Sequence, residues 1–173
     1  MKKIVVIVAF LTWTVLPAVA LAEVTFIWFG APAEVRIKVG TDSGVTTVRH
    51  AVPTSMSGDG TPISGTPAGV LIEVSARRAS AREMNQSYYI LSVDSSNPLS
   101  NGVDTIPFTD ISWTSQDGDI PDGRFDGTSS QIILAPTRAR WQVSDWHTFT
   151  YDNVRALPGG VYSGTVTYTV SIP

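Results

Sequence analysis

The side chains that could carry acid–base or nucleophilic chemistry are few in this chain. Its 173 residues include two histidines, His50 and His147, and no cysteine. No serine lies in the G-x-S-x-G turn that exposes a hydrolase nucleophile. Neither histidine has neighbours at zinc-site spacing, and His147 lies among aromatic residues, as a packed histidine does. The sequence therefore predicts a protein that is not an enzyme and holds no cofactor.

An acidic segment rich in glycine, "SQDGDIPDGRFDG", raises the question of calcium binding. Calcium takes several carboxylate and carbonyl oxygens, which one flexible loop can supply. The spacing differs from that of an EF-hand loop, and no glutamate closes the segment. The alternative is a series of turns in which each aspartate bonds to its own backbone, and we expect these turns. The calcium candidates are Asp117, Asp119, Asp122 and Asp126.

Tryptophan suggests a different ligand. Exposed tryptophans can stack on sugar rings, whereas in a sandwich without disulfides they more often fill the core. A glycan ligand therefore stays open as an alternative. The four tryptophans outside the N-terminal segment are Trp28, Trp113, Trp141 and Trp146.

The N-terminal segment has the layout of a secretory signal peptide. Two lysines precede an apolar run over residues 4–15, and Ala20-Leu21-Ala22 supplies small residues for cleavage. The run is shorter than the roughly 20 residues of a membrane-spanning helix, so we favour cleavage after Ala22 over an uncleaved anchor. The sequence predicts a signal peptide over residues 1–22 and a single domain over residues 23–173. That domain would be secreted, periplasmic or at the cell surface, with no membrane span.

Charge and size narrow the partners of this domain. Without the two leader lysines, 12 − 2 = 10 basic residues face 15 acidic ones, a net charge of 10 − 15 = −5. A nucleic-acid surface needs a basic stripe, so no nucleic-acid partner is expected. The domain has 173 − 22 = 151 residues, enough for a core that stands without disulfides.

Apolar and polar residues alternate along most of the domain, which predicts strands with one buried face. The apolar positions change parity near Thr109-Asp110, where we expect a bulge or a break. Residues 53–69 read as a long loop, and a short helix is expected only near residues 79–86. The predicted strands lie within residues 24–30, 34–40, 45–52, 70–76, 87–94, 105–115, 131–136, 145–153 and 160–173.

This pattern predicts an all-β fold. Half-buried strands need a second sheet over their apolar face, so we expect an antiparallel, immunoglobulin-like β-sandwich of eight or nine strands. In its last strand, Val166, Tyr168 and Val170 should face the core. Thr165, Thr167 and Thr169 should lie on the opposite face.

The C-terminal strand resembles that of cysteine-free pilus subunits of bacterial chaperone–usher systems. The segment "GVYSGTV" at 160–166 is similar to their G-x-Y-x-G-x-V ending, and Gly160 is fourteenth from the end, as in many of them. Ile172 stands where those subunits often have tyrosine, and Pro173 is a further departure. The resemblance implies an immunoglobulin-like domain whose last strand a chaperone or a second copy could pair.

The resemblance also implies that "EVTFIWFG" at 23–30 acts as a donor strand that completes the sheet of a neighbouring copy. The alternative is an ordinary last strand, paired within its own sheet. The residues of the predicted strand-addition interface are Val24, Phe26, Trp28, Gly160, Tyr162, Val166, Tyr168, Val170 and Ile172.

Taken together, these observations predict an exported, non-catalytic structural or adhesive protein. A fimbrial subunit that self-associates by strand addition is the expected form. The alternatives are a secreted carbohydrate-binding module and a secreted hydrolase.

Overall fold

The computed structural model describes residues 7–12, 23–25, 34–40, 47–77, 89–135 and 142–171. These residues form strands and loops, with two short 3₁₀ turns, η1 (Thr54–Met56) and η2 (Phe108–Asp110), and no α-helix. All strand pairs among them are antiparallel. No helix in this part of the chain is long and apolar enough to span a membrane. The predicted all-β class is confirmed.

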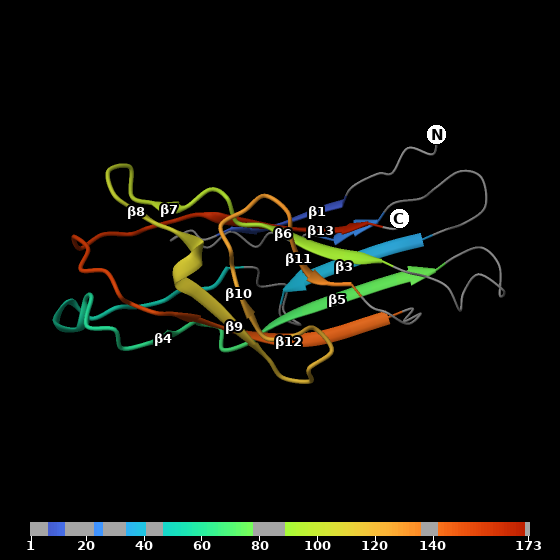
Figure 1. The fold of residues 1–173 in the computed structure, drawn as a ribbon, viewed down its shortest axis with the longest axis horizontal. Coiled ribbons are helices and arrows are strands. Elements are labelled where there is room, and N and C mark those ends of the chain that lie inside the picture. The colour runs from blue at the N-terminus through green and yellow to red at the C-terminus, as the bar shows by residue number, and fades with distance from the viewer. Residues whose placement is uncertain are drawn as a thin grey trace.

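Seven strands form the larger sheet (Figure 1). Its longest strand, β12 (Gln142–Tyr151), pairs with β9 (Ile111–Ser115) on one side and with β5 (Val70–Arg77) on the other, while β4 (Ile63–Ser64) pairs with the last residues of β12. In spatial order the strands are β10 (Gly123–Arg124), β9 (Ile111–Ser115), β12 (Gln142–Tyr151), β5 (Val70–Arg77), β3 (Glu34–Gly40) and β2 (Glu23–Thr25), with β4 (Ile63–Ser64) beside β12.

Four strands form the smaller sheet, and two more make a separate hairpin. The smaller sheet has the order β1 (Ile7–Thr12), β13 (Thr165–Ser171), β6 (Ile90–Asp94) and β11 (Gln131–Leu134). The hairpin consists of β7 (Leu99–Ser100) and β8 (Thr105–Ile106).

The core lies between the two sheets because each sheet turns its apolar face toward the other. On β12, burial alternates along the strand, and Val143, Phe149 and Tyr151 are all buried. The smaller sheet contributes Tyr168 and Val170 of β13 to the same core, and each of these side chains is 1% exposed. Burying a large apolar side chain contributes about 1.5–3 kcal/mol, so this shared layer holds the two sheets together.

The final strand has the predicted register. Val166, Tyr168 and Val170 are buried, and Thr165, Thr167 and Thr169 are half-buried on the other face.

The predicted break is also present. The 3₁₀ turn η2 lies between β8 and β9 and absorbs the change of parity near Thr109-Asp110.

Other expectations about the elements need correction. The described part of the strand expected at 45–52 has only an isolated bridge between Arg49 and Thr66. The loop at 53–69 contains η1 and β4. The structure has thirteen strands in the described residues, more than expected, because four of them have only two residues. The helix expected near 79–86 lies outside the described residues, and the immunoglobulin-like topology stays a prediction.

Candidate functional site

The edge of β13 is the first candidate site. One side of β13 pairs with β6, and the other pairs with β1 over six residue pairs, from Ile7–Val170 to Thr12–Thr165. The segment that forms β1 belongs to the predicted leader, residues 1–22. The last strand of the sandwich is therefore flanked by residues that the sequence predicts to be removed.

The place of β1 in the sandwich explains why this edge matters. Besides β13, β1 contacts β2 and β3 of the larger sheet. It therefore lies across the side of the sandwich, between the last strand of one sheet and the first strands of the other. The positions Ile7, Ala9 and Leu11 lie opposite three residues whose side chains are buried in the core, Val170, Tyr168 and Val166.

The start of the predicted domain pairs within its own sheet. Val24 lies in β2, opposite Ile37 of β3, at the edge of the larger sheet. Phe26, Trp28 and Ile172 lie outside the described residues. The structure therefore places only part of the predicted strand-addition interface. Its N-terminal residue Val24 lies on the larger sheet, whereas the residues of β13 lie on the smaller sheet.

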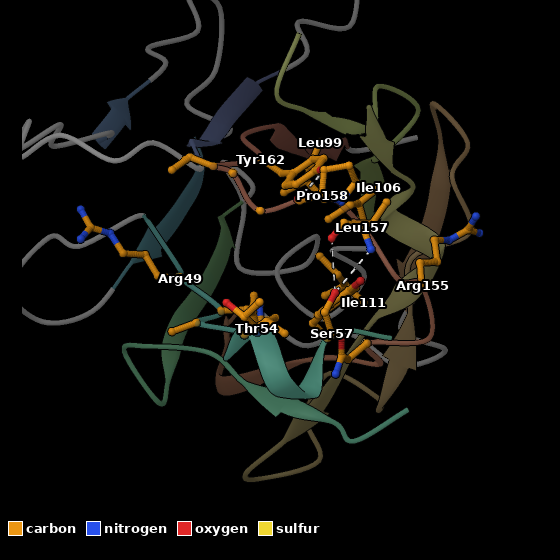
Figure 2. A pocket seen from close by; sticks show the side chains of 18 of the residues that line it. Arg49, Thr54, Ser57, Leu99, Ile106, Ile111, Arg155, Leu157, Pro158 and Tyr162 are labelled. Carbon is orange, nitrogen blue, oxygen red and sulfur yellow. Dashed lines mark hydrogen bonds between the residues drawn. The ribbon is translucent and has the colours of Figure 1, made fainter. Parts of the chain in front are cut away.

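A pocket of about 350 Å³ is the second candidate site (Figure 2). It opens at the end of the sandwich where residues 51–62, 99–106 and 152–162 gather (Figure 1), which we call the loop end. Gly160 and Tyr162, both predicted strand-addition residues, line this pocket. Apolar and aromatic side chains make up most of the wall, among them Leu99, Ile106, Ile111, Tyr151, Leu157 and Tyr162.

Asn153 holds the wall of this pocket together. It is 1% exposed and adopts a positive φ of 53°, which asparagine tolerates better than most residues. Its Oδ1 accepts a hydrogen bond from the Gly58 N–H, 3.0 Å away, and its Nδ2 donates to the Met56 carbonyl and to Asp59 Oδ1. Asn153 thereby fixes the loop at 56–60 to the loop that follows β12.

The charged groups of the pocket point away from its centre. Figure 2 shows Arg49 and Arg155 directed outward on opposite sides. The Arg155 Nε donates to Asp110 Oδ2 over 2.6 Å, and this bond raises the pKa of Arg155. Arg49 is exposed and has no ion pair within the described structure. The centre of the pocket is therefore suited to an uncharged, largely apolar group.

Two tyrosines add polarity to the wall. The Tyr162 hydroxyl donates to the Pro158 carbonyl, 3.2 Å away. Burial and the nearby Asp104 carboxylate raise the pKa of Tyr162. Burial and the Asp110 carboxylate raise that of Tyr151. Both hydroxyls therefore stay protonated at neutral pH.

The structure describes all four calcium candidates. Asp122 accepts from the Ser115 N–H, and Asp126 accepts from the N–H and hydroxyl of Thr128. In the described residues no group of histidine and carboxylate side chains could hold a metal ion. Asp126 forms a turn of the expected kind with the backbone two residues ahead, whereas Asp122 binds the N–H of a residue seven positions before it.

The acidic segment is instead fastened by a buried carboxylate. Asp145 of β12 is 0% exposed and accepts from the Ser115 hydroxyl at 2.5 Å, the Ile120 N–H at 2.8 Å and the Asp117 N–H at 3.1 Å. Burial works to raise the pKa of Asp145, but these bonds and His147 hold it below its usual value. The ionised carboxylate therefore anchors the loop that follows β9.

The two histidines lie in different surroundings. His147 is 1% exposed, its ring stacks on Trp113 at 5.9 Å, and Ser115 donates directly to Asp145 without an intervening imidazole. His50 lies at the pocket, where its Nδ1 is 2.9 Å from the Ile63 carbonyl. Burial lowers the pKa of His50 despite that hydrogen bond.

The described tryptophans form no exposed sugar-stacking platform. Trp113 is 4% exposed, and its indole N–H donates to the Pro121 carbonyl. Trp146 is half-buried. Trp28 and Trp141 lie outside the described residues.

Sequence reasoning did not identify Asn153, Arg49 or the pocket as a whole. Asn153 and Gly58 are 95 positions apart, and no spacing along the chain connects them. Asp145 did carry a signal, because it is an acidic residue at an inward position of the alternating segment at 142–151.

No protein-family model matches this chain, and the searches of curated proteins and of solved structures also find no match.

Proposed function

We propose that this protein is an exported structural or adhesive subunit that assembles by strand addition at the outer edge of β13, the edge that pairs with β1 in the structure. One observation carries the proposal: residues 7–12, which belong to the predicted leader, occupy that edge in six antiparallel pairs. If the leader is removed on export, β13 loses its outer neighbour. An edge strand over a hydrophobic core invites pairing with another chain.

The register of β1 defines the strand that would replace it. The replacement runs antiparallel to β13 and carries apolar residues at alternate positions, opposite Val170, Tyr168 and Val166. A shift by one residue would turn the wrong set of side chains inward.

The segment at 24–29 meets this requirement. It carries apolar residues at the required alternate positions, Val24, Phe26 and Trp28, and its opposite face is also apolar at Ile27 and Phe29. In the proposed assembly these three residues of one copy lie along β13 of the next. Their pairing with β13 takes the place of the short β2–β3 pairing of the single chain.

A peptide competition experiment tests the proposal. The exported protein is purified from cells, and sedimentation velocity and electron microscopy report its state of assembly. A synthetic peptide with residues 23–30 should bind the protein and shorten the assemblies, because it occupies the edge of β13. A matched peptide with the F26D and W28D substitutions should have no effect, since it would bury unpaired charges.

Two results would overturn the proposal. An exported protein that stays monomeric and binds neither peptide has no edge available for strand addition. Retention of residues 1–22 in the exported protein, measured by intact mass spectrometry, would also remove its basis.

A further inference from the structure

Exposed apolar side chains gather at the loop end. Of the four large hydrophobic residues that are most exposed in the described structure, Val103 (89%), Val154 (57%) and Val161 (55%) belong to its loops. The fourth, Ile132, lies on β11. Apolar groups concentrated around a pocket mark an interaction surface more often than the same groups scattered singly.

Val103 is held out rigidly at the tip of the β7–β8 hairpin. Asn101 Oδ1 accepts from the N–H groups of Val103 and Asp104, at 2.8 and 2.7 Å. Ser100 Oγ accepts from the Gly102 N–H at 2.9 Å, and Gly102 has a φ of 92° that suits glycine. The most exposed apolar side chain is therefore presented on a preorganised turn, which lowers the entropic cost of binding.

The pocket lies directly beside this hairpin. Leu99 and Ile106, which pair at the base of the hairpin, form part of the pocket wall. Gly160 of the opposite wall lies against Asn101 of the hairpin. The loop end thus carries a projecting apolar tip and, next to it, an apolar hollow.

Three charged side chains at or beside the loop end, Arg49, Asp59 and Asp104, have no ion pair within the described structure. Asp59 accepts hydrogen bonds from the Thr61 N–H and from Asn153 Nδ2. Arg49 stands at the rim of the pocket with its guanidinium directed outward (Figure 2). Asp104 follows Val103 on the hairpin and is half-buried. Neither takes part in an ion pair within the described residues, where the salt bridges join Lys38–Glu73, Arg124–Asp152 and Arg155–Asp110.

We propose that the loop end is a self-association surface, on which the hairpin tip of one copy enters the pocket of a second copy. Val103 occupies the apolar pocket, and Asp104 faces the second copy's Arg49. The surface holds both members of each complementary pair, tip with hollow and anion with cation. Such a surface pairs with its own copy about a two-fold axis, so both contacts form twice. This interface is separate from the edge of β13 and yields a closed dimer.

Sedimentation velocity of the exported protein tests the proposal. Val103→Asp should raise the dimer dissociation constant at least about tenfold, because it places a charge in an apolar pocket. The fold should survive, since Val103 is 89% exposed, and circular dichroism checks this. Thr114→Asp, on an exposed position of β9, is the matched control and should leave dimerisation unchanged.

A charge reversal identifies the pair. Arg49→Asp and Asp104→Arg should each weaken the dimer, and the two changes combined should restore it, because the ion pair is then re-formed with opposite polarity. Assemblies formed by strand addition at β13 should keep their size when these residues are changed, so the two kinds of association are distinguishable.

Cysteine pairing reports the contact directly, because the chain contains no cysteine of its own. Copies with Val103→Cys and copies with Thr54→Cys, at the pocket, should form mixed disulfide dimers on oxidation. Copies with Val103→Cys and Thr114→Cys should not, because a disulfide needs Cα atoms within about 7 Å.

Three outcomes would overturn the proposal. The first is a wild-type protein that stays monomeric at about 1 mM, which places any dissociation constant beyond useful affinity. The second is a dimer that Val103→Asp leaves intact. The third is a different protein that co-purifies through the loop end of a monomer, which would assign the surface to that partner.

Discussion

His147 makes the stability of the fold depend on pH. Its ring is buried, and neither of its nitrogens has a hydrogen bond. Burial lowers the pKa of His147 to about 4, although Asp145 and Asp122 act in the opposite direction. The unfolded chain, with a histidine pKa near 6.5, binds the proton more readily than the folded chain between pH 6.5 and pH 4. Stability is therefore fully present above pH 6.5 and falls as the pH drops toward 4.

We expect the titration of His147 to lower the free energy of unfolding by about 2–3 kcal/mol between pH 7.5 and pH 4.5. Urea denaturation of the wild type and of His147→Phe at both pH values measures it. The phenylalanine ring keeps the stacking on Trp113 and cannot titrate, so the difference between the two proteins isolates the histidine. Identical pH dependence of both proteins would contradict a buried neutral imidazole.

Asn153 is the residue on which the pocket wall depends. Asn153→Ala removes the bonds to Gly58, Met56 and Asp59 and leaves at a φ of 53° an alanine, which tolerates the left-handed region less well than asparagine. We expect a loss of about 3–5 kcal/mol of unfolding free energy, from lost hydrogen bonds at about 1 kcal/mol each and from backbone strain.

Asn153→Gly separates these two contributions. It loses the same side-chain bonds but tolerates positive φ, so it should cost about 1 kcal/mol less than the alanine variant. Chemical denaturation of both variants measures the difference. An alanine variant no less stable than the glycine variant would show that the left-handed backbone carries no strain.

At the scale of the element, β13 has one buried face and one half-buried face. Val166→Asp puts a charge where the side chain is 0% exposed, and we expect a loss of more than about 3 kcal/mol or failure to fold. Thr169→Asp, on the opposite face, should cost less than about 1 kcal/mol. Thr169 is a cleaner control than Thr167, because Thr167 lies opposite Asp94 and a new carboxylate there would meet a like charge. Thermal melting compares the variants, and equal damage from both would mean that β13 is buried on both faces.

The strands could be predicted because their side-chain period is local. In β3, β6 and β13 the alternation of residue types alone indicates which side chains are buried, and the structure agrees. In β12 residue type is a poorer guide, because the charged Asp145 is buried and the apolar Trp146 is only half-buried. The two-residue strands were missed because they are too short to show a period. The prediction of a strand at 45–52 was wrong because alternation indicates which face of a segment is buried but does not show that a neighbouring strand pairs with it.

The candidate sites likewise could be predicted only where one segment of the chain carries the whole signal. The register of Val166, Tyr168 and Val170 was predictable from one segment of the chain. The pocket was not, because its wall combines three loops that only the packing of the sheets brings together. The pairing of residues 7–12 with β13 was not predicted either, because the sequence indicates that residues 1–22 are a cleaved leader and not part of the domain.

At the scale of the whole molecule, the segment at 23–30 decides between assembly and an ordinary monomer. We expect its deletion from the exported protein to leave a folded domain that no longer polymerises. The part of this segment in β2 belongs to a strand with three pairs to β3, whereas β3 itself keeps seven pairs to β5. Ile37 and Val39 on β3 also remain packed in the core. Losing an edge strand this short should therefore cost little of the cooperative fold, while it removes the proposed donor strand.

Thermal melting and size-exclusion chromatography of the deletion variant measure the two effects separately. The variant should melt cooperatively and elute as a non-polymerising species, and the peptide with residues 23–30, added in trans, should raise its melting temperature by about 5 °C. The rise follows because the peptide binds only the folded domain, at the edge of β13, and so stabilises it by mass action. The F26D and W28D peptide should leave the melting temperature unchanged. If the deletion instead abolishes cooperative melting of a protein that was monomeric at full length, the segment is part of the monomer's own core and strand addition is not its function.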